Sequence, residues 1–327
     1  MNILYILGNG FDIAQNMKTR YRNFYDHLNE HREECSDRLI KLLDEINRDI
    51  DNWSDMEKAL GEYTSKMNSK EDFRELLEEL NLKLRAYLSK QEEKSWVSSL
   101  KKYIKPENAI NILSNPEIYL RPKEKQLIGH FYGLKEIYIV TYNYTKTFER
   151  VFGIKDGKGI SYIGGKISQI IHIHGTLDSG DPIIVGVDNP EQIGNQVFRL
   201  DNEVSEIFVK NQLNDALRNT GPDVFADLIK KSDMIVLYGV SMGETDARWW
   251  RMIGEEFAKR KMMIIRFCYS DISRKSARIA PFERHEVDNT MKKLYESIEM
   301  WPKDYKDRLF VSTDLTIFKM EHLETKL

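Results

Sequence analysis

The segment Ile3-Leu4-Tyr5-Ile6-Leu7-Gly8-Asn9-Gly10-Phe11-Asp12 decides the fold of this 327-residue chain. Its five consecutive apolar residues predict a short buried strand, which the Gly-Asn-Gly turn ends. A helix is expected to open at residues 11–15. The order strand, glycine turn, helix is typical of nucleotide sites in open α/β sheets. Ile13 stands where the dinucleotide fingerprint has its third glycine, so a tight turn without a ligand is an equal alternative.

The same alternation of strands and helices returns in the second half of the chain. Buried-strand patterns lie at 136–141, 169–174, 182–187, 233–238 and 262–269, and helical patterns at 200–230 and 245–259. We therefore expect an α/β fold, a Rossmann-like and mostly parallel sheet with helices on both faces.

A stretch of different character separates these two parts of the sheet. From about residue 20 to 130 charge is dense, and Leu and Ile recur at spacings of three and four, which predicts amphipathic helices. We expect an α-helical insertion at 29–129, with 1–28 and 130–327 forming the α/β nucleotide-binding core.

Composition excludes several classes of protein. Lys and Arg total 49 and Asp and Glu total 52, a formal net charge of −3, so a global basic field for nucleic acid is not supported. No apolar run approaches the length of about 20 residues that a spanning helix needs, and the N-terminus lacks the basic region of a signal peptide. The two cysteines, Cys35 and Cys268, suggest reduced thiols in the cytoplasm.

Polar residues follow two of the expected strands. Thr141-Tyr142-Asn143-Tyr144-Thr145 comes after a buried run, where open α/β sheets bind ligands, although Asn143 or Thr145 capping the next helix is the simpler interpretation. His172-Ile173-His174-Gly175 ends another strand candidate, and alternation would place both histidines on one face. A histidine at a strand end suits a general base near pH 7, against the alternative of a merely buried histidine.

A second glycine turn occurs at Gly239-Val240-Ser241-Met242-Gly243 and leads to Asp246. Its backbone amides are candidates to hold a phosphate. The stretch also fits the Gly-x-Ser-x-Gly nucleophile elbow of serine hydrolases, whose triad needs an acid and a histidine later in the chain. His285 and His322 are available, but both lie in charged stretches without a neighbouring strand.

Two motifs in the helical stretch have structural explanations. His27-Leu28-Asn29-Glu30-His31 fits the His-x-x-Glu-His pattern of some zinc peptidases, yet its charged flanks predict a solvated helix face, and no metal is expected. Ser54 and Glu57 have the spacing of a capping box, with Glu57 also a candidate to face the cleft.

Taken together, these motifs resemble the AbiH family of phage abortive-infection proteins. The resemblance rests on the elements 8–12, 17–21 with Phe24, Trp53 with Glu57, 141–145, 172–175, 186–188 and 238–246. More distantly, Gly8/Gly10, Thr141/Asn143 and His174/Gly175 are similar to the sirtuin-type NAD-binding fold. Two distant cysteines do not build the zinc module of sirtuin deacylases, which favours a likeness to sirtuin-like NAD hydrolases of bacterial defence.

This resemblance implies NAD as ligand or substrate and cleavage of its nicotinamide–ribose bond. Asn143 would orient water or a ribose hydroxyl, and His174 would accept a proton. Asp12 would cap its helix or accept from a ribose hydroxyl, and Asp246 would bind the adenosine ribose. The expected cofactor-binding residues are Gly8, Asn9, Gly10, Phe11, Asp12, Thr141, Gly239, Ser241 and Asp246.

Other functional classes stay open at this point. The glycine turns also suit a non-catalytic nucleotide-binding sensor, and the helical insertion suits an interaction protein. A metal-dependent nuclease is disfavoured, because only Asp12, Asp188 and Asp246 stand at expected strand ends. The expected partners are a small nucleotide and a phage-derived trigger or partner protein, with a homo-oligomer allowed and no membrane.

Overall fold

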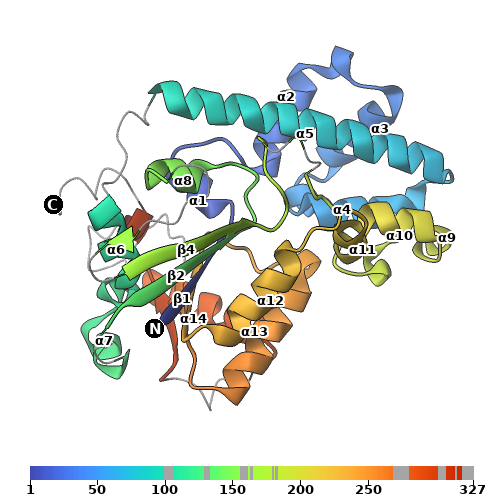
Figure 1. Ribbon diagram of the computed structural model, residues 1–327. Coiled ribbons are helices and arrows are strands. Elements are labelled where there is room, and N and C mark those ends of the chain that lie inside the picture. Colours follow the sequence, from blue (N-terminus) through green and yellow to red (C-terminus); the bar gives the residue numbers. More distant parts are fainter. Residues whose placement is uncertain are drawn as a thin grey trace.

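A seven-stranded sheet forms the centre of the molecule in the computed structural model, with the strand order β3-β4-β2-β1-β5-β6-β7 (Figure 1). All strands except β3, which pairs antiparallel with β4, run parallel. The structure describes residues 1–98, 106–128, 133–154, 161–162, 165–178, 180, 183–267, 280–300, 307–313 and 315–318. The strands are β1 (Asn2–Leu7), β2 (Lys135–Thr141), β3 (Ser161–Tyr162), β4 (Gly165–His172), β5 (Met234–Tyr238), β6 (Met263–Phe267) and β7 (Leu309–Ser312).

The order of the six parallel strands is that of the doubly wound Rossmann sheet, 3-2-1-4-5-6. β1 is central, and its last residue, Leu7, is aligned with Thr141 of β2 and Tyr238 of β5. The chain passes first to one side of β1 and later returns to the other side at β5. The crevice where ligands bind in such sheets therefore falls at the carboxyl ends of β1 and β5.

Helices cover both faces of this sheet, as the sequence predicted. The α-helices are α1 (Gly10–Ala14), α2 (Tyr21–Glu30), α3 (Asp37–Arg48), α4 (Met56–Tyr63), α5 (Lys70–Ser98), α6 (Pro106–Ser114), α7 (Pro122–Ile128), α8 (Thr147–Val151), α9 (Gln196–Arg199), α10 (Asn202–Phe208), α11 (Lys210–Ala216), α12 (Gly221–Lys231), α13 (Ala247–Lys259) and α14 (Ala280–Ser297). Because side chains alternate along a strand, Ile3 and Tyr5 of β1 face α6 and α8, whereas Leu4 and Ile6 face α12 and α13.

A separate helical lobe packs around its own apolar cluster. α2 to α5 form it together with α9 and α10, which come from the chain between β4 and β5. In Figure 1 the long helix α5 runs across the upper part of the molecule, with α2 and α3 above it and α12 and α13 well below. Phe24 and Leu28 of α2 belong to this cluster, whereas Ile110 and Leu113 of α6 pack on the sheet.

Two local predictions are wrong. Residues 183–187 form no strand apart from an isolated bridge between Val187 and Val209, because Val187 pairs its backbone with Phe208 and Lys210, at the junction of α10 and α11, rather than with a strand of the sheet. Asp55, rather than Ser54, caps α4 by accepting a hydrogen bond from the Lys58 amide, which leaves Glu57 free to point inward.

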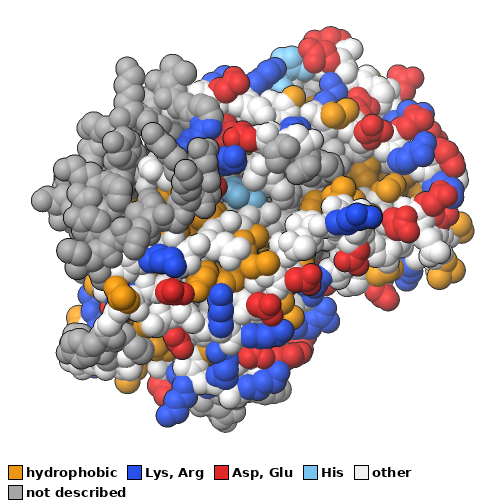
Figure 2. Space-filling model, viewed as in Figure 1, with side chains coloured by type: hydrophobic (Ala, Val, Ile, Leu, Met, Phe, Trp, Pro, Cys, Tyr) orange, Lys and Arg blue, Asp and Glu red, His pale blue; other side chains and the backbone are white. Residues whose placement is uncertain are grey.

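The surface carries charges of both signs. On the face shown in Figure 2, acidic and basic side chains are interspersed over the elements. None of the helices in the described parts of the chain has the length and apolar character needed to cross a membrane.

Candidate functional site at the carboxyl ends of the strands

The two glycine turns predicted from the sequence meet at the centre of the sheet. The amide of Gly8 donates to the Tyr238 carbonyl at 3.0 Å, and the amide of Gly10 donates to the Gly239 carbonyl at 3.0 Å. A Cβ atom on Gly10 would lie only 2.4 Å from Gly239 Cα, and Gly239 itself has a φ of +67°. These glycines therefore let the turns after β1 and β5 pack backbone against backbone.

The neighbouring residues of the first turn point in different directions. The Asn9 side chain donates to the Thr19 carbonyl at 2.8 Å and holds the loop that follows α1. Phe11 lies in the core, where its ring packs against Phe148 and Phe318. The roles of these residues and of the Gly8 and Gly10 amides toward a ligand stay predictions.

Asp12, in α1, contacts the segment that follows β2, the strand next to β1. Its carboxylate accepts hydrogen bonds from Asn143 Nδ2 at 3.0 Å and from the Thr145 hydroxyl at 2.7 Å. Burial raises the pKa of Asp12 to about 7, against the lowering effect of these hydrogen bonds. Asp12 thus fixes the orientation of the Asn143 side-chain amide.

The backbone around Asn143 is held from a second side. Its amide donates to the Thr141 hydroxyl at 3.0 Å, and its carbonyl lies 2.9 Å from His172 Nδ1. His172 Nε2 lies 2.7 Å from Glu149 Oε1. Burial acts to lower the pKa of His172, but the Glu149 carboxylate outweighs burial and raises it. His172 thus supports the loop that carries Asn143.

His174 has different partners, because β4 ends at His172 and the next residues turn. Its Nε2 lies 3.5 Å from Asp246 Oδ1, at the outer limit of a hydrogen bond, and its ring packs on Tyr142. His174 is 6% exposed. Because a carboxylate only accepts hydrogen bonds, this contact favours the tautomer with the proton on Nε2 and the lone pair on Nδ1.

A buried lysine that the sequence did not single out completes this arrangement. Lys210 Nζ donates to Asp246 Oδ1 at 3.0 Å, to Glu57 Oε2 at 2.9 Å and to the Thr245 carbonyl at 3.0 Å. The other oxygen of Glu57 accepts from the Gly186 amide at 3.2 Å. Lys210 therefore links α4 of the helical lobe to the carboxylate beside His174.

Burial and charge set the protonation of this network. Burial acts to lower the pKa of Lys210, but the Asp246 and Glu57 carboxylates raise it. Burial raises the pKa of Glu57, with Lys210 opposing it. Burial would also raise the pKa of Asp246, yet Lys210 and His174 together hold it below its ordinary value. Asp246 and Lys210 are thus a buried ion pair at neutral pH.

Two further polar groups lie beside His174. Burial, and next the charge of Asp246, raise the pKa of Asp188, and Arg251 lies 3.5 Å from its carboxylate. The Tyr142 hydroxyl is buried and has no hydrogen-bond partner among the described residues, and the charges of Asp246 and Asp188 act on it. A buried hydroxyl without a partner costs free energy, so it is a natural contact for a ligand.

The serine of the second glycine turn is not part of this cluster. Ser241 is exposed. The residues of this turn with left-handed backbone conformation are Gly239 and Met242, not Ser241. Among the described residues no histidine is bonded to Ser241, and His285, one of the histidines considered for a triad, is exposed on α14. His322 and Cys268 lie outside the described residues.

Two cavities in the described parts of the chain lie away from these residues. One of about 670 Å³ is lined by α14, and one of about 430 Å³ lies between α2, α5 and the loop after α1. Asn143 and His174 are both less than a tenth exposed.

The fold and site together define a doubly wound α/β protein with a buried polar site at its topological switch point. A family model described as bacteriophage abortive infection AbiH matches residues 4–268, most of the chain. The chain therefore belongs to the AbiH family, and this membership indicates a role in abortive infection. A search of curated proteins finds no match.

Proposed function

We propose that this protein binds NAD at the carboxyl ends of β1, β2, β4 and β5 and hydrolyses its nicotinamide–ribose bond during phage defence. The observation that carries the proposal is that two polar side chains, each in contact with an aspartate, follow strands at the same edge of the sheet. Asn143 is fixed by Asp12, and His174 lies beside Asp246. Hydrolysis needs a group that positions the ribose or water and a group that takes a proton, and these are the roles proposed for the two residues.

The charges of the site suit this substrate. Glu57 and Asp246 share the buried ammonium of Lys210, and Asp188 adds a third carboxyl group, with Arg251 at 3.5 Å from it. Such a site favours the cationic nicotinamide ribose over the pyrophosphate. The Tyr142 hydroxyl, buried without a partner among the described residues, offers a donor to a ribose oxygen. The likeness to sirtuin-like NAD hydrolases supports the same ligand.

The proposed reaction balances without a further co-reactant. The carbon–nitrogen bond to ribose breaks and its electron pair leaves with neutral nicotinamide. Water adds to the ribose carbon, and its proton passes to His174 Nδ1 and then to solvent. Asp246, bonded to Nε2, would stabilise the imidazolium.

The test measures nicotinamide and ADP-ribose released by purified protein, and cellular NAD during phage infection. We expect NAD to fall with the wild type and to stay constant with Asn143→Ala and His174→Ala. His285→Ala, which removes an exposed histidine of α14, is the matched control and should keep full activity. Thermal unfolding of each variant shows that the fold is retained.

Two outcomes would contradict this proposal, one its residue roles and the other hydrolysis itself. If both site variants consume NAD as the wild type does, the proposed roles are wrong. If infection is aborted while NAD stays constant, and calorimetry still shows NAD binding, the protein is a nucleotide sensor. The link from Glu57 through Lys210 to Asp246 would then carry the signal between lobe and sheet.

A further inference from the structure

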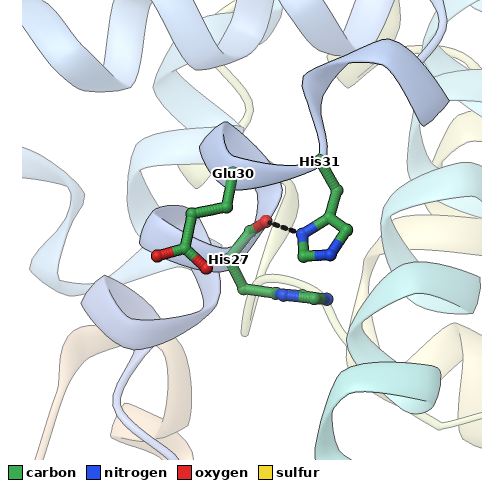
Figure 3. Close-up of side chains that lie close together, drawn as sticks. All are labelled: His27, Glu30 and His31. Carbon is green, nitrogen blue, oxygen red and sulfur yellow. Dashed lines mark hydrogen bonds between the residues drawn. The ribbon is translucent and has the colours of Figure 1, made fainter.

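A group of metal-ligating side chains lies at the C-terminal end of α2, away from the strand ends. His27, Glu30 and His31 each offer a ligand atom, and these three atoms lie within 4.8 Å of one another. Figure 3 shows both imidazole rings on the same side of the helix, with His31 above His27. Their ring centroids are 4.3 Å apart. The sequence predicted a solvated helix face here, and on this partly exposed face the structure gathers the three side chains.

We propose that His27, Glu30 and His31 bind a divalent transition-metal ion of the Zn²⁺ type. Two imidazoles and one carboxylate are a donor set that zinc uses in proteins, with water in the fourth position. Mg²⁺, which prefers oxygen ligands in an octahedron, is excluded by the same donor set.

One of the histidines is already oriented as metal-bound histidines are. His31 Nδ1 lies 2.9 Å from the His27 carbonyl oxygen, which only accepts hydrogen bonds. Nδ1 therefore carries the proton, and Nε2 has the lone pair that a metal requires. A hydrogen bond from the second ring nitrogen to a backbone carbonyl is the usual support of a metal-bound imidazole.

The remaining adjustment is small. Ligands of a tetrahedral zinc ion are roughly 3.3 Å apart, given zinc–ligand distances of about 2.0–2.1 Å. Glu30 is exposed and both histidines are only half-buried, so rotation of the side chains suffices to close the spacing. The negative end of the α2 dipole lies at the same place and favours a cation.

The surroundings leave room for the water ligand. His27 and Glu30 line the polar cavity of about 430 Å³, together with the Asp26 carboxylate. The His27 ring also lies 5.0 Å from the ring of Tyr87, whose hydroxyl donates to the Lys18 carbonyl at 2.7 Å. A bound ion would thus strengthen the contact between α2, α5 and the loop after α1.

The test is direct binding of ZnCl₂ to the full chain, purified with a chelator and dialysed, by calorimetry and elemental analysis. We expect about one Zn²⁺ per chain, no binding of MgCl₂, and a rise in melting temperature with Zn²⁺. His31→Ala and Glu30→Gln should weaken binding by roughly tenfold or more, the size of effect expected when a zinc site is disturbed.

Two control variants test whether the ion binds at α2 rather than at another histidine. His285→Ala, an exposed histidine on another helix, should bind Zn²⁺ as the wild type does. His174→Ala should do so as well. The proposal is overturned if His31→Ala binds Zn²⁺ unchanged, if the wild type binds none, or if binding disappears only in His174→Ala. Circular dichroism of each variant verifies that α2 and the rest of the fold are retained.

Discussion

Replacing Lys210 by methionine tests whether the buried ion network holds the lobe to the sheet. The ammonium of Lys210 donates to Glu57, Asp246 and the Thr245 carbonyl, and the side chain is less than a tenth exposed. Methionine fills a similar volume and removes only the charge and its three hydrogen bonds. The variant leaves two buried carboxyl groups without their cation.

The expected loss of stability follows from the burial of these groups. Removing one partner of a buried ion pair costs about 3–5 kcal/mol, because the other charge stays buried and unpaired. The matched control is Lys230→Met, which breaks an exposed pair with Asp227 on α12. A pair of that kind contributes about 0–1 kcal/mol.

The assay is urea unfolding of the wild type, Lys210→Met, Glu57→Gln and the double variant. Removing both partners should cost less than the sum of the single changes, by about 1–3 kcal/mol, because the residues share one network. Asp246 has a lowered pKa in the folded protein, so the stability it contributes is present above its unfolded pKa and lost on acidification. The deficit of Lys210→Met should therefore be largest at neutral pH and shrink as the pH falls.

The reasoning is refuted if Lys210→Met costs no more than Lys230→Met. It is also refuted if the effects of Lys210→Met and Glu57→Gln simply add. A deficit that stays constant as the pH falls from 7 to below the ordinary pKa of aspartate, about 3.9, would show that the loss comes from packing rather than charge.

Three further predictions rest on other contacts of the site. The pKa of His172 is raised in the folded protein, so its pairing with Glu149 stabilises the fold below the unfolded pKa of histidine. This stabilisation is lost as the pH rises through the folded pKa. Urea unfolding of Glu149→Gln should therefore show a deficit of about 1–3 kcal/mol at pH 5.5 that shrinks by pH 8.5. Asp12 has a pKa of about 7 in the folded protein, so it binds its proton more tightly there than in the unfolded chain. The free energy of unfolding of the wild type should therefore fall by up to about 4 kcal/mol relative to that of Asp12→Asn between pH 4 and 7, with no further change above pH 7. A parallel pH dependence of both proteins would contradict this. Gly10→Ala should push the two glycine turns apart and lower the stability of the fold by at least about 1–3 kcal/mol in melting experiments. Gly243→Ala should cost less, because its new Cβ would meet only side-chain oxygens, the nearest at 3.2 Å. Equal effects would show that the close approach of the turns is unimportant.

Much of the sheet follows from local sequence because its strands are buried on both faces. Runs such as 3–7 and 234–238 have no polar residue to interrupt them, and this marks parallel strands at the centre of a sheet. The expected strand 182–187 has a similar run, but its described part, 183–187, lies against α10 without a neighbouring strand, apart from the bridge at Val187. Apolar character alone does not distinguish a strand from a buried extended segment.

The site was predictable only in part. Asn143 and His174 stand out because each follows a strand at the edge where ligands bind. His172 and His174 looked equivalent by alternation, yet the strand ends at His172 and the turn gives the two rings different carboxylate partners, Glu149 and Asp246. Lys210 carries no local signal, since its neighbours form an ordinary short helix.

The sequence by itself determined the strand–glycine–helix units, because buried apolar runs and glycine turns act over a few residues. Only the tertiary structure decided which charges pair. Lys210 meets Glu57 across 153 positions of the chain and Asp246 across 36, and no local pattern encodes such distances. The reason is physical: a buried ion pair forms only where the packing of lobe and sheet removes both groups from water and brings them within hydrogen-bond reach.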